Sequence, residues 1–401
     1  MCSYLPENSE YLLLLASSTL VFSGLLWRMI KNYSSTILMC PTEENQFLVD
    51  HCPSLNEYRP TPWIFNGHLM TIFGTLIRPN PQHQFERVLL TVDDHGGTVA
   101  IDWHRRPYRH QPILVILHGL TGGSEESYVR WMISCASEKL DVCCVVVHAR
   151  GCGRSQLTTP TAFSAAITDD IRASFKYIRS LVGEQTPIFT VGYSLGAGIL
   201  TKYLGEEGDQ CLLQGAIICC ACFDMMLSTN QLEQWFNALL YNRQLTKNLL
   251  RYLRRHEQHF NHTNSKVNLQ NAYQSRTIRE YDQHVIIPTY GFRDVEHYYS
   301  VASSNQWLKH IRVPALILSA IDDPICSIDG LPIRDVSENP NIITVQTPEG
   351  GHVSYLQGWW PRSYSYDNIV VIEYIRARLK QLNYEWNADT NEQIFIDVNQ
   401  F

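Results

Sequence analysis

One short stretch of the chain has the residue spacing of a catalytic serine. The segment VGYSLGAG contains Gly192, Ser194 and Gly196 as G-x-S-x-G, directly after an apolar run and directly before a helical pattern. That context is typical of a nucleophile elbow, a sharp strand-to-helix turn that projects a serine hydroxyl from a sheet edge. A glycine-rich turn with a helix-capping serine is the alternative. The strand-helix context favours the elbow, and we predict that Ser194 is a nucleophile.

A serine nucleophile needs a base with a pKa near neutrality, which histidine already has. Of the 15 histidines, His352 follows the last predicted strand in TPEGGHVSY, where glycines free the loop to fold back toward Ser194. It also comes last in the chain order Ser, Asp, His that accompanies this elbow. We predict that His352 is the general base, and a surface-loop histidine is the alternative.

The base in turn needs a carboxylate that holds its tautomer and stabilises the imidazolium. The segment ALILSAIDDP offers Asp322 and Asp323 at the end of the preceding strand-like run. We choose Asp323, because Pro324 beside it makes the chain leave the strand there, whereas Asp322 is expected to cap the turn.

Backbone amides near the serine are the candidates for an oxyanion hole. The segment HGLTGG (118–123) follows an apolar run, and its glycines keep the backbone open. We predict that the amides of Leu120 and Leu195 stabilise the oxyanion that develops during acyl transfer. His118 is expected to shape this loop rather than to act as a catalyst.

Strand-like and helical segments alternate around these residues. Most of the strand-like runs are continuously apolar, as expected for strands that are covered on both faces. The order therefore predicts a mostly parallel, doubly wound α/β sheet, and together with the elbow at Ser194 it indicates an α/β-hydrolase fold. The runs are 86–92, 98–104, 113–118, 141–148, 187–194, 215–222, 315–320 and 341–346. The helical segments are 125–138, 167–181, 195–205, 300–310 and 367–382.

Residues 224–300 interrupt the alternation of strand-like and helical segments. They separate two strands by far more than one crossover helix needs, so we expect a helical cap over the carboxyl edge of the sheet, with a long helix at 231–258. In that region His256, His259 and His262 are three residues apart. They could bind a metal, but no carboxylate cluster accompanies them, and we interpret them as a solvated helix face, with a membrane-facing surface as the alternative.

The N-terminal region predicts a membrane anchor. Residues 11–27 (YLLLLASSTLVFSGLLW) carry no charge, and 17 residues is at the short end for a helix that spans a bilayer. Acidic residues precede the run and Arg28 and Lys31 follow it, a pattern that fits a retained anchor better than a cleaved signal peptide. By the positive-inside rule these two charges place the body in the cytoplasm.

We expect four segments in all. They are an anchor at 1–31, an irregular proline-containing linker at 32–60, a catalytic domain at 61–385 that includes the cap, and a polar tail at 386–401.

The composition excludes several classes of function. With 45% hydrophobic residues the chain can bury a large core, and a net charge of −7 lacks the basic excess of a nucleic-acid-binding protein. Many of the 12 cysteines lie in apolar runs such as VCCVVV and AIICCAC, where cysteine behaves as a small hydrophobe. Cys219 and Cys222 form a C-x-x-C pair, but no second pair follows at zinc-site spacing. We therefore expect no metal and no cofactor.

Several further stretches resemble one known family. The chain is similar to the membrane-anchored α/β-hydrolase-domain proteins of the AB-hydrolase-4 group, which contains YheT-like bacterial esterases, yeast medium-chain ethyl-ester synthases and the animal proteins ABHD1, ABHD2 and ABHD3. The resemblance covers roughly residues 60–385 and includes SAIDDP and EGGH. Its other motifs are PWIFNGHLMTIFG (62–74), HGLTGGSEESYVR (118–130), HARGCGRS (148–155), VGYSLGAGILTKYLGEEGD (191–209) and YGFRDVEHYYSVASS (290–304).

The resemblance implies an N-terminal signal anchor and a triad at Ser194, Asp323 and His352. It also implies hydrolysis of lipid carboxylesters, with monoacylglycerol lipases and acetylesterases in one branch, phospholipases in another and acyl transfer to alcohols in the yeast branch. The H-x-x-x-x-D acyltransferase motif of some relatives is absent. The family places its catalytic body on the far side of the membrane, whereas the flanking charges predict the cytoplasmic side, so the orientation stays open.

From all these patterns we expect a single-pass, membrane-anchored serine esterase or lipase of the endoplasmic reticulum or plasma membrane. Its substrates would be acylglycerols or short- to medium-chain acyl esters. The alternatives are an alcohol O-acyltransferase or a phospholipase that uses the same triad. A non-enzymatic lipid-binding receptor is disfavoured, because such proteins commonly lose a triad member and none is missing here.

Overall fold

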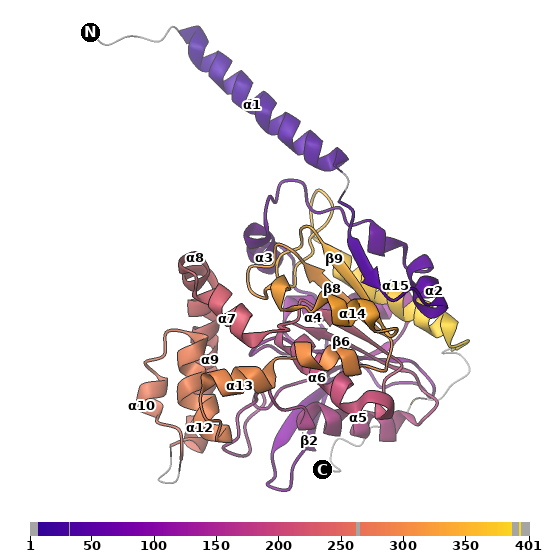
Figure 1. Ribbon diagram of the computed structural model, residues 1–401, viewed down its shortest axis with the longest axis vertical. Coiled ribbons are helices and arrows are strands. Elements are labelled where there is room, and N and C mark those ends of the chain that lie inside the picture. The colour runs from indigo at the N-terminus through magenta and orange to yellow at the C-terminus, as the bar shows by residue number, and fades with distance from the viewer. Residues whose placement is uncertain (1–6, 32, 262–264, 387–392, 394–401) are drawn as a thin grey trace.

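A computed structural model describes residues 7–31, 33–261, 265–386 and 393. Within these residues the chain forms one nine-stranded sheet with the order β1-β9-β8-β7-β6-β4-β5-β3-β2. The six central strands are parallel, and antiparallel strands flank them at both edges. Helices cover both faces of the sheet (Figure 1). The predicted α/β-hydrolase architecture is therefore confirmed.

All eight predicted strands form. Their bounds are β2 Glu86–Thr91, β3 Thr98–Trp103, β4 Ile113–Leu117, β5 Cys143–Val147, β6 Ile188–Tyr193, β7 Gly215–Cys219, β8 Ala315–Ala320 and β9 Ile342–Thr347. The helices of the body outside the cap, apart from α1, are α2 Glu43–Asp50, α3 Gly67–Leu76, α4 Ser127–Leu140, α5 Asp169–Val182, α6 Leu195–Glu207, α14 Ile333–Glu338 and α15 Tyr366–Gln381. Short 3₁₀ turns lie at Pro53–Asn56, Gly208–Gln210, Asn305–His310 and Ile328–Gly330.

The central strand β4 shows why continuously apolar runs form this sheet. Successive side chains of a strand point to opposite faces. Ile113, Val115 and Leu117 pack into the core shared with α5 and α6. Leu114 and Ile116 pack into the core shared with α4 and α15. A strand with a polar face would leave one of these two cores incomplete.

The expected linker at 32–60 is wrong, because most of this segment belongs to the folded body. Strand β1 (Thr36–Met39) pairs antiparallel with β9, and Thr42 caps the helix α2 that follows. Leu48, Leu55 and Tyr58 are buried in the core beneath α15. The prolines only separate these short elements, whose stability comes from packing on residues far along the chain.

Helix α1 (Glu7–Ile30) projects away from the body (Figure 1). Side chains along it, such as Leu15, Leu20, Phe22 and Ile30, are exposed. No helix within the described residues meets the length and hydropathy expected of a membrane-spanning segment.

The insertion after β7 forms a helical cap with its own core. Its helices are α7 Met225–Glu233, α8 Trp235–Asn237, α9 Arg243–Arg255, α10 Leu269–Ala272, α11 Ile278–Tyr281, α12 Ile287–Tyr290 and α13 Val295–Ala302. Two π-helical segments lie at Ala238–Asn242 and Asp282–Ile286, and a 3₁₀ turn at Glu257–His259. The cap core includes Phe163 and packs against Leu120 and Leu195 at the carboxyl edge of the sheet.

Two of the predicted helical segments differ from the helices that form. The long helix expected at 231–258 is interrupted at Gln234, whose backbone is extended, and ends at Arg255. The segment expected at 300–310 is the end of α13 followed by a 3₁₀ turn, because Ser303 leaves the helical conformation. The predicted polar tail lies outside the described residues except for Trp386 and Gln393.

Candidate active site

Ser194 occupies the turn between β6 and α6. Its backbone has φ 54° and ψ −118°, a conformation that L-residues rarely adopt and that marks a strained turn. Two backbone hydrogen bonds hold it: the Ser194 amide donates to Cys219 O at 3.0 Å, and the Gly198 amide donates to Ser194 O at 3.1 Å. The strain is therefore balanced by bonds to β7 and α6.

The glycines on either side of this serine are required by close backbone packing. A Cβ at Gly192 would lie 2.8 Å from Ala197 Cα, and a Cβ at Gly196 would lie 2.5 Å from His118 O. Both distances are shorter than van der Waals contact. The G-x-S-x-G spacing thus follows from how tightly α6 approaches β4 and β6.

The structure brings the three predicted catalytic residues into one hydrogen-bonded chain. His352 Nε2 lies 2.9 Å from Ser194 Oγ, and His352 Nδ1 lies 2.8 Å from Asp323 Oδ2. With Nδ1–H donating to the carboxylate, Nε2 is free to accept the serine proton. The His352 amide donates to Thr71 Oγ1 at 2.8 Å, so α3 also fixes the histidine loop.

The two adjacent aspartates have different partners. Asp323 is buried, and its Oδ1 accepts hydrogen bonds from the amides of Ile325 at 2.8 Å and Cys326 at 2.9 Å. Asp322 Oδ1 instead accepts from the Gly351 amide at 2.9 Å. Burial raises the pKa of Asp322 to about 6. The geometry therefore pairs Asp323, not Asp322, with His352.

The predicted oxyanion donors flank the serine. Leu120 and Leu195 line the same cavity as Ser194. Leu195 is the first residue of α6, so its amide has no acceptor within the helix. In the facing loop, the Gly119 amide donates to Tyr128 Oη at 2.8 Å, and Leu120 is the next residue.

His118 is hydrogen-bonded within the loop that contains Leu120, in keeping with the structural role that we expected. Its Nδ1–H donates to Gly119 O at 2.7 Å, and its Nε2 accepts from the Ala149 amide at 3.1 Å. Burial, with a smaller effect of His148, lowers the pKa of His118 to about 3. The ring is therefore neutral near pH 7, and its tautomer is set by these two bonds.

A buried polar network behind this loop was missed from the sequence. Asp102 Oδ2 accepts from Ser124 Oγ at 2.6 Å and from His148 Nε2 at 2.8 Å, while Arg87 binds both carboxylate oxygens. Burial opposes ionisation, but the bonds from Arg87 and His148 hold the pKa of Asp102 well below its usual range. The sign of this network in the sequence is Asp102 itself, a single acidic residue inside the apolar run TVAIDWH.

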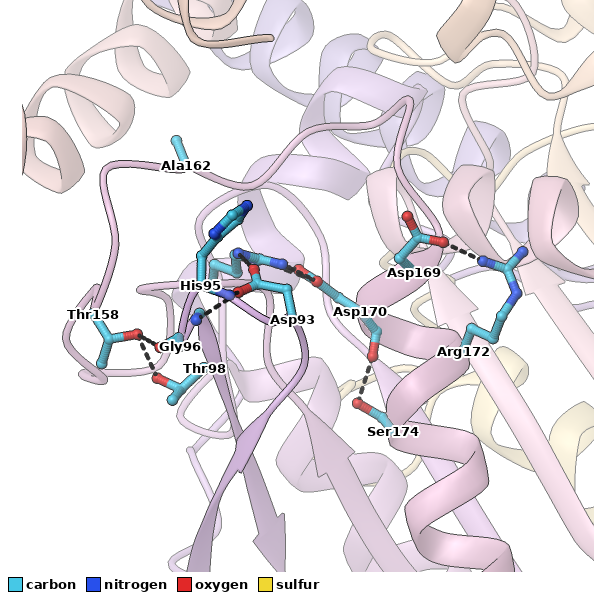
Figure 2. Close-up of polar contacts among 12 residues, drawn as sticks. Asp93, His95, Gly96, Thr98, Thr158, Ala162, Asp169, Asp170, Arg172 and Ser174 are labelled. Carbon is cyan, nitrogen blue, oxygen red and sulfur yellow. Dashed lines mark hydrogen bonds and ion pairs between the residues drawn. The ribbon is translucent and has the colours of Figure 1, made fainter. Parts of the chain in front are cut away.

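Arg150 is a second residue that the sequence analysis did not single out. Its guanidinium donates to Asp93 Oδ2 at 2.6 Å and, through two nitrogens, to Asp170. Figure 2 shows Asp93 at the β2–β3 turn close to Asp170 on α5. The Arg150 carbonyl accepts from Tyr252 Oη at 3.0 Å, so this arginine also ties the body to the cap.

A cavity of about 880 Å³ extends from the triad under the cap. This volume lies within the usual range of small-molecule sites. Its apolar wall includes Phe163, Met225, Leu249, Ile286 and Val353, beside Ser194 and His352. An acyl chain fits this chemistry, with the ester group at the serine.

The histidines of the cap do not form the solvated face that we expected. His256 is buried, its Nε2–H donates to Gly151 O at 2.9 Å, and its Nδ1 accepts from the Leu157 amide at 3.4 Å. This burial was not predictable, because it depends on a loop about 100 residues earlier. His259 is half-buried, and His262 lies outside the described residues.

One set of possible metal ligands does lie at the site. Cys220, Asp323 and His352 have ligand atoms within 4.8 Å of one another. The aspartate and the histidine are already bonded to each other in the triad, and burial raises the pKa of the Cys220 thiol well above its usual value. The donor set is therefore better explained as a hydrolase triad beside a neutral thiol.

Comparisons with known proteins agree with this geometry. A family model described as the alpha/beta hydrolase fold matches residues 112–358. The chain is 32% identical to mouse phospholipase ABHD3 over 344 residues, which cover 84% of this chain and 82% of that protein. It is 37% identical to the monoacylglycerol lipase of Saccharomyces cerevisiae over 308 residues, which cover 76% of this chain and 62% of that protein.

A second yeast protein, the medium-chain fatty acid ethyl ester synthase/esterase 2, is 33% identical over 264 residues, which cover 61% of this chain and 58% of that protein. The family model matches more than half of the chain, and the resemblance found in the sequence is confirmed by these relatives. This chain belongs to the α/β-hydrolase family, in the group that contains phospholipase ABHD3 and the yeast ester synthases/esterases.

Proposed function

We propose that the protein is a serine carboxylester hydrolase acting on lipid esters, with Ser194 as nucleophile, His352 as general base and Asp323 as the orienting acid. The observation that carries this proposal is the continuous hydrogen-bonded chain from Asp323 through His352 to Ser194. A strained serine at a sheet edge, hydrogen-bonded to a histidine that a carboxylate orients, is the arrangement that acyl transfer requires.

The proposed reaction has two halves. Ser194 Oγ attacks the ester carbonyl while His352 Nε2 takes the hydroxyl proton, and the amides of Leu120 and Leu195 stabilise the oxyanion. The tetrahedral intermediate then collapses, the C–O bond to the alcohol breaks, and His352 returns the proton to the leaving alcohol. Water repeats these steps on the acyl-enzyme and releases the fatty acid and free Ser194.

The substrate class is supported by the cavity and by the relatives. The apolar wall of the cavity beside Ser194 suits acyl chains, and similar proteins are named phospholipase, monoacylglycerol lipase and ester synthase/esterase. We further propose that α1 associates with a lipid bilayer, because it exposes large apolar side chains such as Leu20 and Phe22 away from the body.

A second candidate is acyl transfer to an alcohol. The acyl-enzyme is the same, and the choice between water and alcohol depends on access to the pocket. The specific support is the similarity to the yeast ethyl ester synthase/esterase.

The deciding experiment uses the purified full-length protein with monoacylglycerols, lysophospholipids and ethyl esters, with and without added ethanol. Released fatty acids and newly formed ethyl esters are identified by mass spectrometry. Fatty acids as the main product support hydrolysis, and ethyl esters as the main product support the transferase. No product from any ester, with the chain folded, contradicts both.

A further inference from the structure

The tip of the cap exposes apolar side chains that nothing in the described residues covers. Trp235 is 80% exposed, Leu239 55% and Phe236 40%. They lie on α8 and on the π-helical turn that joins it to α9. Exposed large apolar groups that cluster in this way mark an interaction surface rather than random exposure.

More exposed aromatic rings lie at the same end of the body. Trp359 and Trp360 are each 56% exposed, and Trp63 joins them through its Nε1–H bond to Trp359 O at 2.7 Å and its ring contact with Trp360 at 5.9 Å. Helix α3 connects the two groups, since the ring of His68 lies 4.9 Å from that of Phe236 and the ring of Phe73 lies 5.5 Å from that of Trp63. Figure 1 shows α3, α8 and the base of α1 along the upper side of the body.

The base of α1 is fixed to this end rather than loosely tethered. Arg28 donates to Ile64 O at 2.7 Å and to Pro62 O at 3.0 Å, and it forms an ion pair with Glu349 at 2.6 Å. Its guanidinium also lies over the ring of Phe65, which is itself 58% exposed. The exposed aromatic surface is thus continuous with the exposed apolar helix α1.

Basic side chains follow the exposed tip along α9. Arg243, Lys247, Arg251 and Arg254 are spaced by four, four and three residues, which places them on one helix face, and all are exposed. The helix contains no acidic residue, and within the described part of the chain none of the four forms an ion pair. This unpaired positive charge stands on a chain whose net charge is −7.

We propose that the cap tip and the Trp359–Trp360 loop form a second membrane-contact surface, seated in the headgroup region of an anionic lipid bilayer. Tryptophan rings favour this interfacial layer, and Arg243 and Lys247, the basic residues of α9 that come first after the tip, meet the lipid phosphates. Leu232 and Leu245, on the helices that flank α8, line the cavity. Acyl chains therefore enter from the lipid layer. This inference extends the proposed lipid-ester hydrolysis and rests on it.

The first test measures contact directly. The full-length protein is incorporated in vesicles of phosphatidylcholine and phosphatidylserine in which the phosphatidylcholine acyl chains are brominated, and the quenching of tryptophan fluorescence is recorded. We expect W235F/W360F to lose the larger part of the quenching seen in the unmodified chain, while the control W307F/W386F retains it. Trp27 of α1 is present in both variants. Equal quenching in the two variants, or no quenching in either, overturns the proposal.

The second test addresses the basic residues. R243E/K247E should hydrolyse an ester embedded in phosphatidylserine-containing vesicles on the order of fivefold more slowly, because each basic residue near an anionic surface contributes to attraction. The control K176E/K309E makes the same change of charge at exposed positions on α5 and on the 3₁₀ turn Asn305–His310. Equal rates for the two variants contradict the proposal.

A soluble short-chain ester separates failure of this proposal from failure of the proposed function. R243E/K247E should hydrolyse it at the unmodified rate, because neither residue lines the cavity. A chain that is inactive on both esters contradicts the proposed function, and the quenching experiment still decides the membrane contact.

Discussion

The Gly351 amide donates a hydrogen bond to Asp322 Oδ1 at 2.9 Å, and this contact anchors the loop that carries His352. The next residue, Asp323, turns its carboxylate to the other side and binds the His352 ring at 2.8 Å. Two consecutive acids therefore support one histidine in different ways: Asp322 through the loop backbone and Asp323 through the imidazole.

We predict that Asp323→Asn lowers turnover on the order of a thousandfold or more, because a neutral amide neither fixes the tautomer of His352 nor stabilises its imidazolium. Asp322→Asn is the matched control and should cost far less, since an amide oxygen still accepts the Gly351 bond. Turnover of a soluble ester is compared for both, with folding checked by circular dichroism. If Asp322→Asn is the more damaging change, the assignment of the triad acid is wrong.

Ser194→Ala should abolish both esterase activity and labelling by a fluorophosphonate probe. The free energy of unfolding should change little, because the hydroxyl is placed for chemistry and its loss leaves the backbone bonds of the elbow intact. Labelling is read by mass spectrometry of the modified peptide. Label found at another serine in the variant would contradict the assignment of Ser194 as the nucleophile.

His352→Ala should lower turnover about as much as Ser194→Ala, because nucleophile and base act as a unit. For the same reason the double variant should be no slower than either single variant. Initial rates on one soluble ester decide this. Additive losses in the double variant would mean that the two residues act independently.

Asp102→Asn should destabilise the protein by about 3 kcal/mol, because it removes the buried charge that pairs with half-buried Arg87 and weakens the bonds from Ser124 and His148. Asp50→Asn, at an exposed position on α2, is the matched control and should stay within about 0.5 kcal/mol. Urea unfolding followed by fluorescence gives both values. Equal unfolding free energies for the two variants would show that the Asp102 network does not stabilise the fold.

The stability of the cap should depend on pH through Asp282. Burial raises the pKa of this carboxyl to about 7, although the hydrogen bond that it accepts from Tyr299 at 2.9 Å acts to lower the pKa. The folded state then holds a proton that the unfolded state has lost, so the contribution to stability is present below about pH 4 and falls as pH rises to about 7.

Asp282→Asn removes this titration and keeps an acceptor for Tyr299. The variant should therefore be more stable than the unmodified chain at pH 8, by a few kcal/mol at most, and close to it or less stable at pH 4. Melting temperatures across this range give the difference. A constant difference at all pH values would show that Asp282 does not titrate there.

Much of the fold and of the site could be predicted from local patterns. Largely apolar runs located β2 to β9, and the central strands are apolar along their whole length because they are covered on both faces. The glycines around Ser194 located the elbow, and the turn after β8 located Asp323. These features depend on a few neighbouring residues, so the sequence records them directly.

Other features were decided only by contacts between distant segments. Strand β1 has four residues and exists because β9, about 300 residues later, offers its edge. His256 is buried because the loop at Gly151 closes over it, and Asp102 is ionised because Arg87 and His148 converge on it. The sequence by itself determined which residues could form the triad and the strands that carry them. Pairing, burial and charge balance required the tertiary structure, because each arises between residues that are far apart in the chain.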